Sequence, residues 1–256
     1  MNRIDQLFET KKQHIFSVYF TAGYPKLDDT APVIQALEAH GVDLIEVGIP
    51  FSDPMADGPT IQQSGTVALN NGMSLKTLFR QLKDIRASVK IPLIMMGYLN
   101  PILQYGIEKF CRDCAAIGID GMIIPDLPFA DYQTQFKPVV ERYGLHCIML
   151  ITPETSDERI RQIDENTSGF IYMVSTASTT GAKDSFDEKT LGYFRRINDM
   201  NLSNPRMIGF GISNKMTFDA ACAHANGAII GSAFVRLLGE AGRVESAVAN
   251  LVEKIK

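Results

Sequence analysis

The sequence has few features that would connect it with a membrane or with nucleic acid. No apolar run approaches the roughly 20 residues that cross a bilayer, and no apolar run of signal-peptide type follows the first six residues, MNRIDQ. The formal net charge is −4 and no run of Lys or Arg occurs, which excludes a basic nucleic-acid-binding surface of the usual kind. We therefore expect a cytoplasmic globular protein that binds neither membranes nor nucleic acid.

Cysteine and histidine are scarce, with four residues of each type. Cys111 and Cys114 form one C-x-x-C pair, but no second pair of Cys or His stands at zinc-binding spacing. The two cysteines also share a helical pattern with Ile107 and Phe110, which indicates reduced thiols in the core. No H-x-H or H-E-x-x-H motif is present, so the sequence predicts no metal site.

The chain does contain a regular alternation of short apolar runs and amphipathic stretches. The runs are rich in Ile, Val and Met, which is typical of strands covered on both faces. They comprise residues 14–21, 44–48, 92–96, 121–124, 146–151, 170–174, 207–210 and 228–230. Between them lie helical patterns, including those after Ser74, after Ser156, from Ser213, and over residues 234–238 and 244–255.

Eight strands that alternate with about eight helices predict an α/β fold, a (β/α)8 TIM barrel. No linker rich in Pro, Gly or Ser divides the pattern, so we expect residues 1–256 to form a single TIM-barrel domain. Ile4, Leu7 and Phe8 indicate an extra N-terminal helix that could cover one end of the barrel. The alternative architecture is an open, doubly wound sheet.

The second predicted strand carries a carboxylate among apolar residues. In a TIM barrel the active site forms at the C-terminal ends of the strands. Glu46 lies near that end, between Ile45 and Val47, so we expect it to point into the barrel or its mouth. Burial would raise its pKa, which suits proton transfer near neutral pH. The alternative is a Glu held by a neighbouring hydroxyl or backbone donor.

The stretch between the second and third strands is the longest connection in the chain, about 44 residues from Gly48 to Pro92. We expect the surplus to lie in a functional loop after the second strand. This loop contains Asp53 and Asp57, which are either catalytic or turn-capping residues.

Glycine-rich turns follow the last two strands, at residues 209–213 and 231–233. Bare backbone N–H groups at helix N-termini bind phosphate, and this is the usual phosphate position in such barrels. The alternative is tight turns that require positive φ. A hydroxyl-rich segment at residues 175–185 is either a mobile lid or an ordinary exposed loop.

Several motifs together resemble the tryptophan synthase alpha subunit family. They are FTAGYP at 20–25, EVGIPFSDPMADGPTIQ at 46–62, PDLP at 125–128, GFGIS at 209–213 and GAIIGSA at 227–233. They occur in the family's order and span nearly the whole chain. The second of them is the most specific, because both acids and the proline-glycine frame are in register.

The resemblance implies a carbon–carbon lyase that cleaves indole-3-glycerol phosphate to indole and glyceraldehyde 3-phosphate, a retro-aldol step of tryptophan biosynthesis. It implies that Glu46 protonates the indole ring carbon and helps the glycerol hydroxyl lose its proton. It implies that Asp57 accepts a hydrogen bond from the indole N–H and stabilises the cationic ring.

The resemblance also implies binding residues. Matches to phosphate-contacting positions are Gly181, Gly209, Phe210, Gly211, Gly231 and Ser232, and matches around the indole pocket are Tyr19, Ile61, Tyr98 and Tyr172. Thr180 matches the lid residue that helps close the site over Asp57. The lid departs from many relatives, because Ala177-Ser178-Thr179 replaces a Gly-containing stretch before Thr180.

The family's partner is the beta subunit, which uses pyridoxal phosphate to join indole to serine. The resemblance therefore implies an alpha2beta2 heterotetramer, with the loops after the second and sixth strands near the partner and no cofactor in this chain. Three alternatives stay open: another phosphate-binding barrel such as a sugar-phosphate isomerase, a stand-alone lyase, or a barrel that mainly activates its beta subunit.

Overall fold

A computed structural model describes residues 1–175 and 186–256 of the chain. Eight parallel strands close into a barrel in chain order, and β8 pairs back to β1. The strands are β1 Ile15–Thr21, β2 Leu44–Gly48, β3 Leu93–Met96, β4 Gly121–Ile123, β5 His146–Ile151, β6 Ile171–Val174, β7 Arg206–Gly209 and β8 Gly227–Ile230. The closed barrel confirms the predicted TIM-barrel class and excludes the open, doubly wound sheet.

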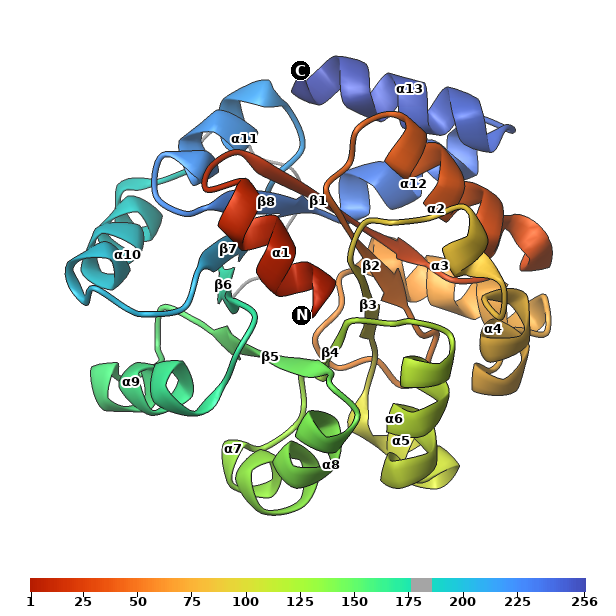
Figure 1. The fold of residues 1–256 in the computed structure, drawn as a ribbon. Helices are drawn as coiled ribbons and strands as arrows, with labels where there is room; N and C mark the ends of the chain where they lie inside the picture. The colour runs from red at the N-terminus through yellow and green to blue at the C-terminus, as the bar shows by residue number, and fades with distance from the viewer. Residues whose placement is uncertain (176–185) are drawn as a thin grey trace.

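Helices surround the barrel as an outer layer (Figure 1). The α-helices are α1 Arg3–Thr10, α2 Thr30–Ala39, α3 Pro59–Asn70, α4 Leu75–Gln81, α5 Leu99–Tyr105, α6 Ile107–Ala116, α7 Phe129–Asp131, α8 Lys137–Arg142, α9 Asp157–Asn166, α10 Glu188–Asp199, α11 Lys215–Cys222, α12 Ser232–Glu240 and α13 Val244–Ile255. Two 3₁₀ turns, η1 Leu27–Asp29 and η2 Ile85–Ala87, and a π-helical turn, η3 Tyr132–Phe136, complete the elements.

The strands alternate between two apolar layers, as the near-continuous apolar runs require. One layer faces the helices, and the other fills the barrel. The interior layer comprises Ile15, Leu44, Ile94, Met96, Ile123, Ile148, Phe170, Tyr172, Val174, Met207 and Ile229, together with Ile4 and Phe8 from α1. Because Leu44 and Glu46 lie two residues apart on β2, their side chains share the interior face.

The predicted N-terminal helix is present and lies across the end of the barrel where the strands begin (Figure 1). Asn2 caps α1 by accepting a hydrogen bond from the Ile4 backbone N–H at 2.9 Å. Ile4 and Phe8 enter the barrel, and the Phe8 ring lies 5.8 Å from that of Phe170. This end of the barrel is therefore closed by apolar packing.

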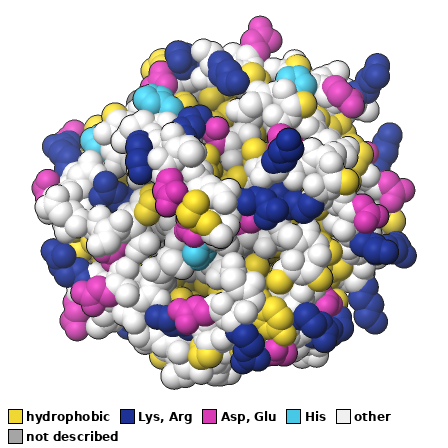
Figure 2. Space-filling view, in the orientation of Figure 1, with side chains coloured by type: hydrophobic (Ala, Val, Ile, Leu, Met, Phe, Trp, Pro, Cys, Tyr) yellow, Lys and Arg dark blue, Asp and Glu magenta, His cyan; other side chains and the backbone are white. Residues whose placement is uncertain are grey.

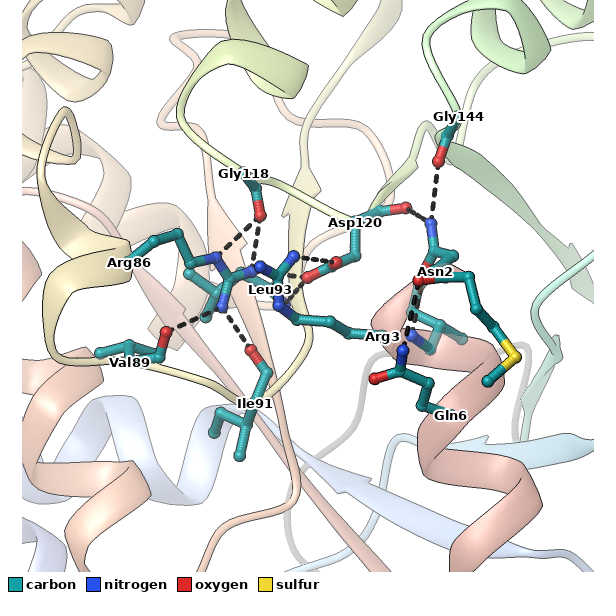
Figure 3. A network of polar contacts seen from close by, with 12 residues as sticks. Asn2, Arg3, Gln6, Arg86, Val89, Ile91, Leu93, Gly118, Asp120 and Gly144 are labelled. Carbon is teal, nitrogen blue, oxygen red and sulfur yellow. Dashed lines mark hydrogen bonds and ion pairs between the residues drawn. The ribbon is translucent and has the colours of Figure 1, made fainter.

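Polar groups around Asp120 fasten α1 to the same end (Figure 3). Asp120 is buried and accepts hydrogen bonds from Arg86 Nη2 at 2.6 Å, the Leu93 N–H at 2.9 Å and Arg3 Nη1 at 3.0 Å. Arg86 makes four further hydrogen bonds, to the carbonyls of Val89 and Ile91 and two to that of Gly118. All five guanidinium N–H groups are thereby used.

A second polar chain joins α1 to the start of β5. His146 Nε2 lies 2.8 Å from Asp5 Oδ1, and His146 Nδ1 lies 2.6 Å from Ser168 Oγ.

On the face that shows α1, acidic and basic side chains are interspersed (Figure 2). None of the helices in residues 1–175 and 186–256 is both long and apolar enough to cross a membrane.

Two local expectations were wrong. The surplus after β2 is mainly helical rather than loop, because α3 occupies residues 59–70 ahead of the predicted helix α4. Pro59 at the start of α3 suits the first turn of a helix, while the polar and β-branched residues that follow hide the apolar pattern. The helix after β7 begins at Lys215, since Asn214 rather than Ser213 caps it.

All four cysteines are buried with free thiols, as expected of core residues.

Candidate active site

The end of the barrel opposite α1 carries the carboxylate predicted from β2. Glu46 is fully buried and pairs in register with Tyr19 on β1 and Ile94 on β3. Neither of its carboxylate oxygens has a hydrogen-bond partner within the described residues. Burial raises the pKa of Glu46 to about 8, and the Ser17 hydroxyl acts in the opposite direction. A carboxyl group with this pKa is protonated at pH 7 and can give up its proton in a reaction.

The second predicted catalytic residue lies on the loop that follows β2. Asp57 Oδ2 accepts a hydrogen bond of 3.0 Å from the Tyr98 hydroxyl, and that hydroxyl accepts one of 2.9 Å from the Ala56 N–H. Phe51 packs on the Tyr98 ring with centroids 5.4 Å apart. Partial burial raises the pKa of Asp57, and the Tyr98 hydrogen bond opposes that shift. Tyr98 therefore connects β3 with the loop and holds the Asp57 carboxylate.

Two further tyrosines complete the surroundings of the carboxylates. Burial raises the pKa of Tyr172, with Glu46, Asp57 and Tyr19 adding to the effect. The pKa of Tyr19 is raised by burial and then by Asp57. The structure thus brings together five of the predicted site residues, from three strands and two loops. They are Tyr19, Glu46, Asp57, Tyr98 and Tyr172.

Glycine makes room for two of these rings. A Cβ atom added to Gly48 would overlap the hydroxyl end of Tyr19, and one added to Gly209 would overlap that of Tyr172. Neither glycine is required by a positive φ. Gly209 is therefore needed for close approach of a ring, in addition to any contact it makes with phosphate.

The predicted phosphate turns lie side by side, because β7 and β8 are paired. Phe210 and Gly211 both adopt left-handed backbone conformations, with φ of 70° and 75°. Such a conformation is strained for Phe210, and Ser175 supports it by donating to the Phe210 carbonyl at 2.7 Å. At the second turn, Gly231 precedes α12, and no side-chain oxygen of the described residues caps the start of this helix.

Tyr19 lies between the cluster around Glu46 and the turn that follows β8. A Cβ atom on Gly231 would lie 3.7 Å from the Tyr19 ring, and the Phe210 ring lies edge-on to Tyr172 at 6.3 Å. Bare backbone donors and the cluster of aromatic and acidic side chains are thus adjacent. This arrangement suits a ligand with a phosphate at one end and an aromatic ring at the other.

The remaining predicted residues have different outcomes. Ile61 lies half-buried in the first turn of α3, directly after the Asp57 loop. Asp53 is exposed and accepts a hydrogen bond from the Ser52 hydroxyl. Thr180 and Gly181 lie outside the described residues, as do Ala177, Ser178 and Thr179.

Ser175, the first residue of the hydroxyl-rich segment identified in the sequence, supports the β7 turn. A polar residue near the site that was missed is Ser17, which lies buried on β1 with its hydroxyl unpartnered among the residues that the structure describes. The signal for Ser17 was the one that singled out Glu46, a polar residue inside an apolar run. Serine is common enough in strands that this signal is weaker for it.

Known proteins match this chain over nearly its whole length. The family model described as tryptophan synthase alpha chain matches residues 6–256. A tryptophan synthase alpha chain from Parabacteroides distasonis is 63% identical over 256 residues, covering 100% of both chains, and one from Bacteroides thetaiotaomicron is 62% identical with the same coverage.

Solved structures agree with the sequence relatives. A crystal structure of tryptophan synthase subunit alpha from Legionella pneumophila superposes with a TM-score of 0.88 at 32% identity, covering 100% of this chain and 97% of that one. A tryptophan synthase complex from Pyrococcus furiosus matches with a TM-score of 0.84 at 33% identity, covering 95% and 98%. The chain therefore belongs to the tryptophan synthase alpha chain family.

Proposed function

We propose that this chain performs its family's reaction, the retro-aldol cleavage of indole-3-glycerol phosphate to indole and glyceraldehyde 3-phosphate, with Glu46 as the acid–base group. The family assignment makes the chain a carbon–carbon lyase of tryptophan biosynthesis. The observation that supports the role of Glu46 is a fully buried carboxyl group, unpartnered in the described part of the chain, with a pKa raised to about 8.

One carboxyl group can serve both proton transfers. Protonated Glu46 gives its proton to the indole ring carbon that carries the glycerol chain, which leaves a cationic ring and a Glu46 carboxylate. The carboxylate then takes the proton of the adjacent glycerol hydroxyl. As that C–O bond becomes a carbonyl, the carbon–carbon bond breaks, and its electron pair returns to the ring. Glu46 ends the cycle protonated, and a pKa near the working pH suits both steps.

Asp57 stabilises the cationic ring in this scheme. An anion that accepts a hydrogen bond from the indole N–H favours positive charge on the ring nitrogen. The Tyr98 hydroxyl already holds one Asp57 oxygen, which leaves the other for the substrate. Tyr19, Tyr172 and Ile61 line the proposed indole pocket.

The phosphate is placed at the opposite end of the substrate, on the turns after β7 and β8. We assign Gly209, Phe210, Gly211, Gly231 and Ser232 to this subsite, with Gly181 as a further contact and Thr180 as the lid residue over Asp57. Backbone N–H groups and the positive end of α12 can bind a phosphate dianion without Lys or Arg. An overall charge of −4 is therefore compatible with an anionic substrate.

The partner in this proposal is a beta subunit in an alpha2beta2 heterotetramer, to which indole passes directly. The pyridoxal phosphate belongs to that subunit, and this chain needs no cofactor for proton transfer by carboxylates. Met55 supports the β2 loop as a contact, because its apolar side chain is 91% exposed at the rim of the site. A cytoplasmic location follows from the biosynthetic role.

The test is indole release from indole-3-glycerol phosphate by the wild type and by Glu46→Gln. We expect a loss of about 10²–10⁴-fold in kcat, the usual contribution of a positioned acid–base group. Glu141→Gln is the matched control, since it makes the same chemical change at an exposed carboxylate on α8, and it should keep full activity. Full activity in Glu46→Gln would refute the assignment.

Titration with a beta subunit separates the two remaining alternatives. High indole release by this chain alone would favour a stand-alone lyase. An inert chain that becomes active in the complex would favour an activated subunit, and a complex in which only the beta reaction accelerates would favour an activator.

A further inference from the structure

A buried hydroxyl on the strand next to Glu46 has no part in the scheme above. Ser17 is fully buried on β1, between Ile15 and Tyr19 on the interior face of the strand. Its register partner on β2 is Leu44, and that of Tyr19 is Glu46. Ser17 therefore lies one interior step below Glu46, on the adjacent strand and on the same face.

Ser17 and Glu46 are both unsatisfied. Ser17 Oγ and the two Glu46 oxygens each have no hydrogen-bond partner among the described residues. An unpaired buried polar group costs free energy, and adjacent unpaired groups in one interior are rare unless they serve a function. A hydroxyl can donate one hydrogen bond, and a carboxylate only accepts. The two groups are thus complementary once Glu46 is ionised.

The other groups around Glu46 are tyrosines, a second carboxylate and apolar side chains. Tyr19 and Tyr172 are the titratable groups whose pKa values respond to the Glu46 charge. Asp57 repels a Glu46 carboxylate, and the neighbouring interior positions Leu44 and Ile94 are apolar. The Ser17 hydroxyl is the group that opposes the effect of burial on the pKa of Glu46.

We propose that Ser17 is a positioning residue, whose hydroxyl turns to donate a hydrogen bond to the Glu46 carboxylate when Glu46 has given up its proton. This inference rests on the proposed acid–base role of Glu46. It gives the carboxylate a defined partner between the two proton transfers. The hydroxyl is unpaired in the resting state because protonated Glu46 does not require it.

The test follows the ionisation of Glu46 directly, in the unliganded full-length chain. The infrared carbonyl band of its protonated carboxyl group is isolated as the difference between a protein and its Glu46→Gln form. Its titration is recorded for the wild type, Ser17→Ala and Ser17→Cys. Cys has nearly the volume of Ser and is a weak donor. Cys147→Ala is the control, because it removes a similarly sized buried group from β5 on the outer face.

We expect both Ser17 variants to raise the Glu46 titration midpoint by about one pH unit, equivalent to a tenfold loss of preference for the carboxylate. Cys147→Ala should not move it. An unchanged midpoint in the Ser17 variants would overturn the proposal. A lowered midpoint would also overturn it, since it would mean that water entering the space solvates the carboxylate better than Ser17 does.

The pH profile of kcat/KM, which reports the pKa values of the free enzyme, then separates this inference from the proposed function. In the proposed mechanism the alkaline limb of the profile moves upward together with the infrared midpoint. If the infrared midpoint moves and the pH profile does not, the hydrogen bond from Ser17 to Glu46 is supported. The proposed acid–base role of Glu46 is then refuted. If the midpoint does not move while Glu46→Gln is inactive, only the Ser17 inference fails.

Discussion

Two polar clusters of the barrel, one beside α1 and one around Glu46, differ in how far their hydrogen bonds are satisfied. At the α1 end, Asp120 is buried and Arg86 is largely buried, and both have their hydrogen-bonding capacity used (Figure 3). At the other end, Glu46 and Ser17 are buried with no partner in the residues that the structure describes. A satisfied network stabilises the fold, whereas an unsatisfied carboxyl group keeps free energy available for a ligand or a proton. The difference separates the stabilising end from the reactive end.

The largest stability effect should come from the satisfied end. In Asp120→Ala, the Arg86 guanidinium loses its anionic partner while its side chain stays only 16% exposed. Breaking a buried pair in this way costs about 3–5 kcal/mol, which urea denaturation would measure as a lower free energy of unfolding.

Asp113→Ala is the control for that comparison, because it breaks more exposed ion pairs with Lys109 and Arg112 and should cost about 1 kcal/mol or less. The kcat of the folded Asp120→Ala enzyme should stay near the wild-type value. If the Asp120 variant is as stable as the Asp113 variant, the network at the α1 end contributes little and the contrast between the two ends is wrong.

An effect of comparable size, opposite in sign, is expected from the unsatisfied end. The pKa of Glu46 is about 8 in the folded state against 4.5 for the free group. Folding therefore disfavours the charged form, and stability is lost as the pH rises from about 4.5 through about 8, at about 1.4 kcal/mol per pH unit.

Glu46→Gln removes this dependence. The free energy of unfolding of the variant, relative to that of the wild type, should therefore rise between pH 6 and pH 8 and stay constant above pH 8. Denaturant melts at several pH values would measure the difference. A difference that stays flat over that range would show that Glu46 ionises in the folded protein as readily as in the unfolded chain.

The smallest effect should come from the more exposed contact of α1. Asp5 is 39% exposed where it meets His146, so solvent screens the interaction. Asp5→Asn should lower the free energy of unfolding by about 1 kcal/mol or less, as measured by the same denaturation. A loss as large as that in Asp120→Ala would mean that the His146 contact, rather than Asp120, fastens the helix.

The barrel, and the two catalytic candidates at one of its ends, could be predicted from the sequence. Eight apolar runs in alternation predict the strands, because strands covered on both faces need apolar residues at nearly every position. Glu46 could be found because a carboxylate interrupts such a run. Asp57 could be found only through the specific motif around it, since an Asp in a turn is otherwise unremarkable.

The α1 end could not be predicted to the same depth. Arg86 and Asp120 are 34 residues apart, and Arg3 is 117 residues from Asp120. Each looks like an ordinary surface charge until the barrel closes and brings the three side chains together around the buried Asp120. Helix α3 was missed for a related reason: its stability comes from packing on the barrel rather than from a clear apolar stripe of its own.

The position of α1 has a consequence for how the chain is made. Asn2 donates hydrogen bonds to the carbonyls of Asp120 and Gly144, which lie 118 and 142 residues further along, and Phe8 packs on Phe170. During synthesis from the N-terminus, the first helix emerges long before its docking surface exists. For more than half of translation its apolar side has no native surface to cover, so docking of α1 closes a loop of well over 100 residues rather than starting the fold.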